Sequence, residues 1–203
     1  MEVIRFINNM LNSNSYIISC SNKEVWVIDP GDSSLILSWI NSNNKVLKGI
    51  LVTHYHFDHI YGINDLQNLY PNAKVYSSIE TYHGLCSSKL NMSLYNETPF
   101  EIKNKDVNII KHEDKIELWD EIYCTAYETL GHNNDCFSFY VNNCLFTGDA
   151  FIPGVKLYLG AKKANKEQAY KTIDWIINNF DKNTIIYPGR NEHSLIKDAI
   201  ILK

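Results

Sequence analysis

The sequence predicts an α/β protein built from two similar halves. Short apolar runs rich in β-branched and aromatic residues recur along the 203 residues and are typical of strands. Segments with apolar residues at helical spacing lie between several of these runs. In each half, a short apolar run ends at polar residues. No low-complexity linker divides the chain, so we expect one domain over residues 1–203.

The first half is predicted to open with antiparallel strands and then to alternate helix and strand. A helix follows Asp29-Pro30-Gly31-Asp32, with Ser33 or Ser34 as its cap. A second helix is expected from Asp58 or His59 to Leu69, and a third over residues 85–95. The expected strands cover residues 3–7, 15–20, 24–28, 49–53 and 73–77.

The second half is predicted to repeat this pattern more loosely. Residues 166–180 form an amphipathic helix capped by Asn165, with Ala169, Ile173, Ile176 and Ile177 facing inward. A short helix is expected from Ser194. The expected strands cover residues 107–110, 122–129, 137–141, 144–147 and 184–187.

Composition argues against several classes of protein. The apolar fraction of 45% and the charged fraction of 21% are ordinary for a soluble globular protein. A net charge of −4 gives no reason to expect binding to nucleic acid or membranes. The N-terminus lacks the apolar region of a signal peptide, and the five cysteines are scattered without a Cys-x-x-Cys pair. We therefore expect a cytoplasmic protein with reduced thiols and a small-molecule substrate.

The segment Thr53-His54-Tyr55-His56-Phe57-Asp58-His59 carries the chemistry. Three histidines and a carboxylate lie within six positions, directly after an apolar strand. His54 and His56 share one face of an extended backbone, so both imidazoles can bind one ion, at about 2.0–2.1 Å each. Asp58 and His59 follow where the chain enters a helix, and the changed geometry can direct them to a second ion.

This segment resembles the His-x-His-x-Asp-His motif of the metallo-β-lactamase superfamily. Further motifs of that family follow in the same order: an early aspartate at Asp29, Gly131-His132, and Gly148-Asp149. The resemblance covers nearly the whole chain, up to Gly189. It implies a four-layer αββα sandwich, with a metal site at one edge between the two sheets.

The resemblance also implies a role for each matched residue. His54, His56 and His132 would hold the first metal, Asp58 and His59 would contribute to the second, and Asp149 would bridge them. Asp29 would hydrogen-bond a ligand histidine and fix its tautomer. The alternative is that Asp29 serves only as a turn residue before Pro30-Gly31. Zn²⁺ is expected as one or two ions, with Fe or Mn as alternatives, because imidazole and carboxylate accept all three.

One departure from the family pattern concerns the last motif. The family usually has Pro-Gly-His, whereas this chain has Pro188-Gly189-Arg190. A guanidinium cannot ligate a metal because it stays protonated and has no acceptor. Two outcomes are open. In the one we favour, His193 folds back to complete the second metal site, with Glu192 as a further candidate ligand. In the other, the second metal is weakly bound or absent, and Arg190 binds an anionic group of the substrate.

The implied activity is hydrolysis. A water on such ions has its pKa lowered towards about 7, and Asp58 would orient it or carry its proton. An aspartate at position 149 and a histidine at 56 resemble the thioesterase and lactonase branch, which cleaves ester, thioester or lactone bonds of small molecules. A mononuclear-iron persulfide dioxygenase and a non-catalytic metal-binding protein remain alternatives. Lys156, Tyr158 and Lys162 are expected to be solvated loop residues, with substrate contact as the alternative.

Overall fold

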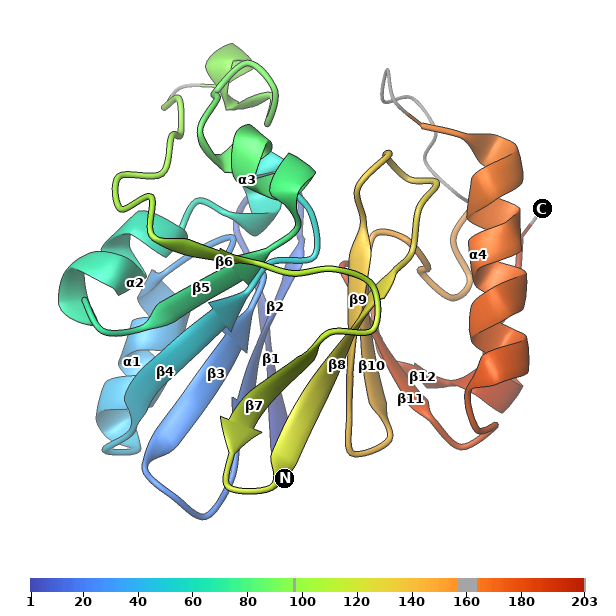
Figure 1. Ribbon diagram of the computed structural model, residues 1–203, viewed down its shortest axis with the longest axis horizontal. Helices are drawn as coiled ribbons and strands as arrows, with labels where there is room; N and C mark the ends of the chain where they lie inside the picture. Colours follow the sequence, from blue (N-terminus) through green and yellow to red (C-terminus); the bar gives the residue numbers. More distant parts are fainter. Residues whose placement is uncertain (97, 157–163, 203) are drawn as a thin grey trace. The chain divides into compact units, whose positions relative to one another are not determined.

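The protein forms two compact units, residues 1–110 and 111–203, each built on one six-stranded mixed sheet (Figure 1). This computed structural model describes residues 1–96, 98–156 and 164–202. The predicted α/β class is confirmed by these two sheets and their helices. That residues 1–203 form a single domain stays a prediction. Among the described residues, no helix has the length and apolar character that a membrane span requires.

The sheet of the first unit has its strands in sequence order. β1, β2 and β3 pair antiparallel, and β3 to β6 pair parallel. Parallel pairing requires crossover connections, which α1, α2 and α3 supply. The elements are β1 (Glu2–Ile7), β2 (Asn14–Ser19), β3 (Glu24–Ile28), α1 (Ser34–Ser42), β4 (Val46–Leu51), the 3₁₀ turn η1 (Phe57–His59), α2 (Ile63–Leu69), β5 (Lys74–Ser77), α3 (Ile79–Leu85), the 3₁₀ turn η2 (Ser93–Tyr95) and β6 (Val107–Ile109).

Apolar side chains from α1 and α2 pack onto this sheet. Ile36 and Ile40 of α1 and Ile63 and Leu66 of α2 are fully buried in one cluster with strand residues such as Ile50. Burial of each such side chain contributes about 1.5–3 kcal/mol to folding. This core fixes the strands and therefore fixes the loops at their ends.

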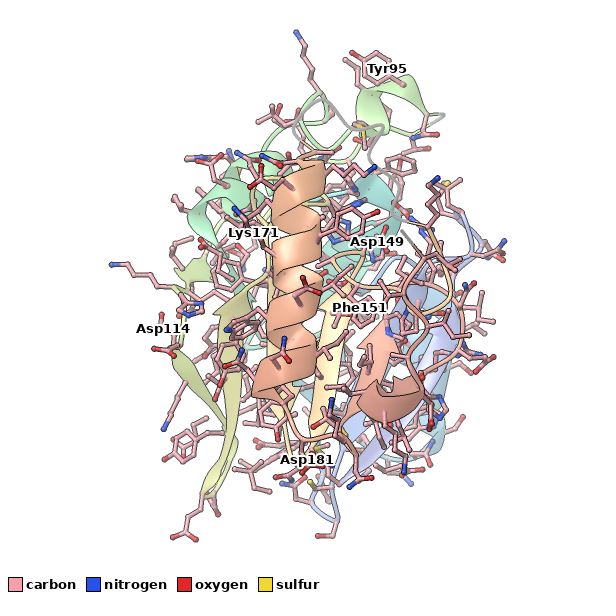
Figure 2. The ribbon with its side chains drawn as sticks, turned by 90° about the vertical axis from the view of Figure 1, so that its right-hand side faces the viewer. Tyr95, Asp114, Asp149, Phe151, Lys171 and Asp181 are labelled. Carbon is pink, nitrogen blue, oxygen red and sulfur yellow. The ribbon has the colours of Figure 1, made fainter. Side chains whose placement is uncertain are left out.

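The second unit has the strand order β12-β11-β10-β9-β8-β7, with β10 and β11 parallel and the other pairs antiparallel. Figure 2 shows α4 in front of this sheet, where Ile173 and Ile176 pack on Leu145, Phe151 and Ile186. The elements are β7 (Lys115–Trp119), β8 (Ile122–Glu128), β9 (Phe137–Val141), β10 (Cys144–Gly148), α4 (Lys166–Asn179), β11 (Ile185–Pro188), β12 (Ser194–Leu195) and the 3₁₀ turn η3 (Ile196–Asp198).

One helix prediction in the first unit is wrong in its boundaries, and one predicted cap lacks its side-chain hydrogen bond. The helix expected from Asp58 to Leu69 is split, because the amide of Gly62 donates to the carbonyl of Pro30 at 2.7 Å instead of continuing a helix. Ser33 stands at the N-cap position of α1, as predicted, but its side chain makes no capping hydrogen bond, and the amide of Ser34 donates to the Asp32 carboxylate at 2.9 Å.

The expected helix over residues 85–95 is also wrong. The helix lies earlier, over Ile79–Leu85, because the Ser78 hydroxyl accepts from the amide of Thr81 and starts it there. Met92 has a left-handed backbone, with φ of 68°, which interrupts any helix through this segment.

In the second unit one strand was not predicted, and the short helix expected from Ser194 begins later, as a 3₁₀ turn after a short strand. β7 has the alternating burial of a half-buried strand, with Ile116 and Leu118 buried. The segment from Ser194 pairs with β11 as β12 before the turn η3. The predicted cap of α4 is confirmed, since the Asn165 side chain accepts from the amide of Gln168 at 3.1 Å.

Candidate metal centre

Two parallel strands of the first unit deliver polar residues to the same edge of the sheet. Ile28 at the end of β3 pairs with Leu51 at the end of β4. Because the strands run parallel, the residues that follow them emerge together. Asp29 follows β3 directly, and His54 lies three residues beyond Leu51. The fold therefore brings together side chains that are 25 positions apart in the sequence.

The histidine-rich loop after β4 packs its imidazoles against one another. His54, His56 and His59 are buried, and Asp58 is only 2% exposed. The ring centroid of His54 lies 4.7 Å from that of His56 and 4.4 Å from that of His59. The turn η1 aims Asp58 and His59 inward, with Asp58 Oδ2 3.5 Å from His59 Nε2. Buried imidazoles and a carboxylate in contact are a donor set that suits a transition-metal ion.

Asp29 and Thr53 fix the orientation of these histidines. The carboxylate of Asp29 accepts from the amide of Thr53 at 2.7 Å and from its hydroxyl at 2.5 Å. Since that proton goes to Asp29, the Thr53 oxygen accepts from Nδ1 of His54 at 2.9 Å, which leaves the lone pair of His54 on Nε2. The Asp29 carboxylate also faces His59, whose Nδ1 lies 3.3 Å from Oδ2. Asp29 is thus placed to set two imidazole orientations.

In the second unit, His132 and Asp149 lie close together. Asp149 follows β10, and His132 follows Gly131 in the loop after β8. Oδ2 of Asp149 is 3.7 Å from Nε2 of His132, and both residues are buried. Gly131 has φ of 134°, and a Cβ there would lie 2.3 Å from the Cα of Ala169 in α4. Only glycine fits this approach, which positions His132.

Arg190 forms an ion pair with Asp149. Its Nη2 lies 3.2 Å from Oδ2 of Asp149. His193 is exposed and its ring stacks on Tyr187, with centroids 5.5 Å apart. Burial, together with the neighbouring Cys144, raises the pKa of Tyr187 to about 12, so this partner is a neutral phenol near neutral pH. Glu192 is also exposed.

The sequence of this chain matches a known protein family over a range that includes most of the residues described above. The family model of the metallo-beta-lactamase superfamily matches residues 9–190. The chain belongs to this superfamily. The match ends at Arg190, so it includes every predicted site residue except Glu192 and His193.

Curated relatives of this superfamily member are hydroxyacylglutathione hydrolases. One from Prochlorococcus marinus (strain MIT 9312) is 30% identical over 88% of this chain and 65% of its own length. One from Prochlorococcus marinus (strain NATL1A) is 30% identical over 96% of this chain and 72% of its own length. One from Buchnera aphidicola is 31% identical, and the chain spans 53% of its length. The chain is thus similar to about half to three quarters of each relative.

Solved structures show the same fold. The BLEG-1 B3 metallo-beta-lactamase aligns with a TM-score of 0.89 at 21% identity, over 97% of this chain and 95% of that one. ETHE1 from Myxococcus xanthus aligns with a TM-score of 0.76 at 20% identity, over 97% of this chain and 80% of that one. The metallo-β-lactamase fold predicted from the motifs is therefore confirmed.

Sequence reasoning missed a buried polar network behind the histidine loop of this superfamily member. The Ser13 hydroxyl donates to the carbonyl of Asp58 at 2.6 Å, and that of Ser15 donates to the carbonyl of Asp29 at 2.6 Å. Asn8 Nδ2 donates to Ser13 at 2.9 Å. All three side chains are buried. The one available sequence signal was the polar run Ser13-Asn14-Ser15 beside an apolar strand.

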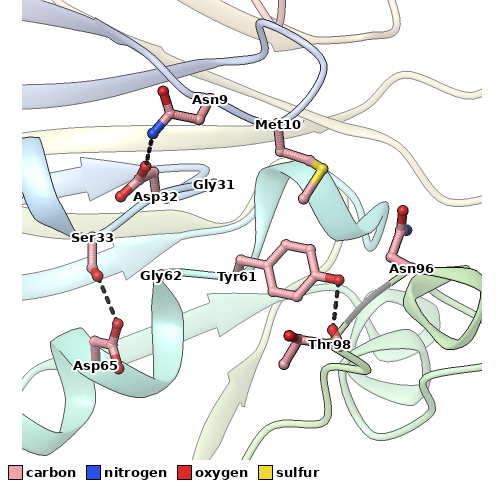
Figure 3. A pocket seen from close by; sticks show the side chains of 10 residues that line it. All are labelled: Asn9, Met10, Gly31, Asp32, Ser33, Tyr61, Gly62, Asp65, Asn96 and Thr98. Atoms are coloured by element: carbon pink, nitrogen blue, oxygen red, sulfur yellow. Dashed lines mark hydrogen bonds between the residues drawn. The ribbon is translucent and has the colours of Figure 1, made fainter.

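A separate cavity of about 570 Å³ lies in the first unit (Figure 3). Its polar groups bond to one another: Asn9 donates to Asp32, Ser33 donates to Asp65, and Tyr61 donates to the carbonyl of Thr98. None of the predicted metal ligands lines it. Lys156, in the loop after β10, is exposed, whereas Tyr158 and Lys162 lie outside the described residues.

Proposed function

We propose that the chain is a metal-dependent hydrolase that cleaves an ester, thioester or lactone bond of a small molecule. The observation that carries the proposal is the buried imidazole cluster of His54, His56 and His59, in which Asp29 and Thr53 contact His54 and His59. Membership of the superfamily supports it. The curated relatives are named for hydrolysis of hydroxyacylglutathione, which favours thioesters as the first substrates to test.

The residues present fit a transition-metal ion. Imidazole nitrogens and carboxylate oxygens are its usual ligands, and the proposed tautomer of His54 presents the lone pair of Nε2. Zn²⁺ is the proposed ion, as one or two per chain, with Fe or Mn as alternatives. His193 as a ligand and Arg190 as a substrate-binding group stay predictions. The proposed ligands are His54, His56, Asp58, His59, His132 and Asp149.

The proposed chemistry divides between the ion and the side chains. A bound dication lowers the pKa of water towards about 7. Asp58 is held by the turn η1 and by the hydrogen bond from Ser13 to its carbonyl, and its carboxylate would orient a water at the ion and accept its proton. Asp29 acts through Thr53 and His59 and keeps the imidazoles in place for binding. We include a small-molecule substrate and a cytoplasmic location in this proposal, without nucleic-acid or membrane partners.

The test is metal removal and reconstitution with substrate panels. Purified protein is stripped with a chelator and reloaded with Zn²⁺, Fe²⁺ or Mn²⁺, and thioesters, lactones and carboxylic esters are assayed. We expect hydrolysis that disappears with the metal and returns with it. Oxygen uptake with a glutathione persulfide, in place of hydrolysis, would instead support the dioxygenase. Stoichiometric metal without turnover of any substrate would support a non-catalytic protein.

A further inference from the structure

Arg190 gives Asp149 a permanent positive partner. The two side chains form an ion pair of 3.2 Å, in which Asp149 is 5% exposed and Arg190 is 27% exposed. A guanidinium stays protonated throughout the pH range of folded proteins. The negative charge of Asp149, which the proposed function assigns to a metal, is therefore already balanced by a side chain.

The backbone holds this pair in place. β10 and β11 are parallel, and Gly148 pairs with Pro188 at their ends. The amide of Gly189 donates to the carbonyl of Gly148 at 2.7 Å. Residues 149 and 190 therefore leave neighbouring strands side by side, one position beyond this hydrogen bond. The strand register therefore places the two residues next to each other, and the ion pair does not depend on a chance meeting of flexible surface side chains.

The alternative ligand, His193, is exposed and packs its ring on Tyr187. Phe146, Tyr187 and His193 stack in a row across β10, β11 and the start of β12, with centroids 4.9 Å and 5.5 Å apart. The antiparallel register that pairs Ile186 with Ser194 continues to place His193 opposite Tyr187. Moving the His193 ring to a metal centre would therefore cost its stacking contact with Tyr187.

We propose that Arg190 takes the place of a second metal ion, so that the centre binds one ion per chain. This inference rests on the proposed function, since it needs Asp149 to belong to a metal centre. A second dication next to Asp149 would meet a fixed like charge and a carboxylate oxygen that already accepts a hydrogen bond. It would also lack the ligand that a histidine at position 190 would supply.

The test counts zinc ions per folded chain. Wild type and three variants are dialysed against excess Zn²⁺. The zinc bound per protein chain is then measured by elemental mass spectrometry. Arg190→His removes the charge and adds a ligand, whereas Arg190→Leu removes the charge alone. Lys197→His adds a histidine at an exposed position of the same unit as a matched control. Circular dichroism confirms that each variant is folded.

We expect one ion in wild type, in Arg190→Leu and in Lys197→His, and two ions in Arg190→His. Two ions in wild type would overturn this inference and leave the proposed function standing. One ion in a folded Arg190→His variant would overturn it as well. No ion in wild type would overturn the proposed function itself. Because the wild-type count is decisive alone, the inference stays testable even if a variant does not fold.

Discussion

The hydroxyl of Ser13 donates a 2.6 Å hydrogen bond to the carbonyl of Asp58, although 45 residues separate them in the sequence. Ser13 lies in the loop between β1 and β2, and Asp58 lies in the turn η1. The bond ties the backbone of the histidine loop to the first hairpin. A residue without any ligand chemistry thus sets the position of one that is proposed to act on water.

Ser13→Ala tests this positioning role. We expect zinc affinity to fall roughly 10-fold or more, as for other residues that orient metal ligands. Stability should fall by about 1–3 kcal/mol, because the Asp58 carbonyl loses a buried donor. Zinc affinity is measured by competition with a chelator. Ser19→Ala is the control, since the buried Ser19 hydroxyl contacts the carbonyl of its neighbour Cys20. Equal zinc affinity in both variants would contradict the role.

Asp29→Asn separates the charge of Asp29 from its backbone conformation. Asp29 has φ of 48°, a left-handed conformation that asparagine also tolerates, so the turn should survive. The amide cannot accept on both sides as the carboxylate does from Thr53, nor can it carry the charge that faces His59. We expect zinc affinity to fall roughly 10- to 100-fold.

The matched control for that change is Asp65→Asn, which alters an exposed carboxylate bonded to Ser33. Chelator competition should show wild-type affinity there. A folded Asp29→Asn variant that binds zinc as tightly as the control would show that Asp29 is a turn residue alone.

Gly131→Ala should be strongly destabilising. The new methyl group would meet the backbone of Ala169 at 2.3 Å, on a residue with φ of 134°. Backbone strain costs about 1–3 kcal/mol and overpacking about as much again. Gly154→Ala provides the comparison, because Gly154 also has a positive φ, of 75°, but open space around its Cβ. Urea unfolding should show a much larger loss for Gly131→Ala, and equal losses would rule out the packing explanation.

Local chemistry was the part of the site that the sequence could predict. The histidine loop places its ligand types within six positions after an apolar strand, and the early aspartate and Gly-Asp motifs follow strands too. Strand ends that share an edge then bring Asp29 to Thr53 and Arg190 to Asp149. These residues meet because the strands that carry them pair in parallel, and the pattern of alternating strands and helices makes parallel pairing predictable.

Features that depend on long-range contacts could not be predicted. Ser13 and Ser15 are ordinary loop and strand residues until the fold supplies the carbonyls they bond. The helix expected over residues 85–95 is interrupted by the left-handed backbone of Met92. Near Asp58, a contact between Gly62 and Pro30 split a helix that local pattern alone would continue. In the serine and Gly62 cases a tertiary contact outweighs local propensity.

The most direct measurement is the metal content of wild type, His56→Ala and Asp149→Ala, purified and loaded identically. His83→Ala, which alters an exposed histidine of α3, is the matched control. We predict that wild type and the control hold zinc, and that both site variants lose most of it while keeping their circular dichroism spectra. Unchanged zinc content in the two site variants would contradict the metal centre and, with it, the proposed hydrolase.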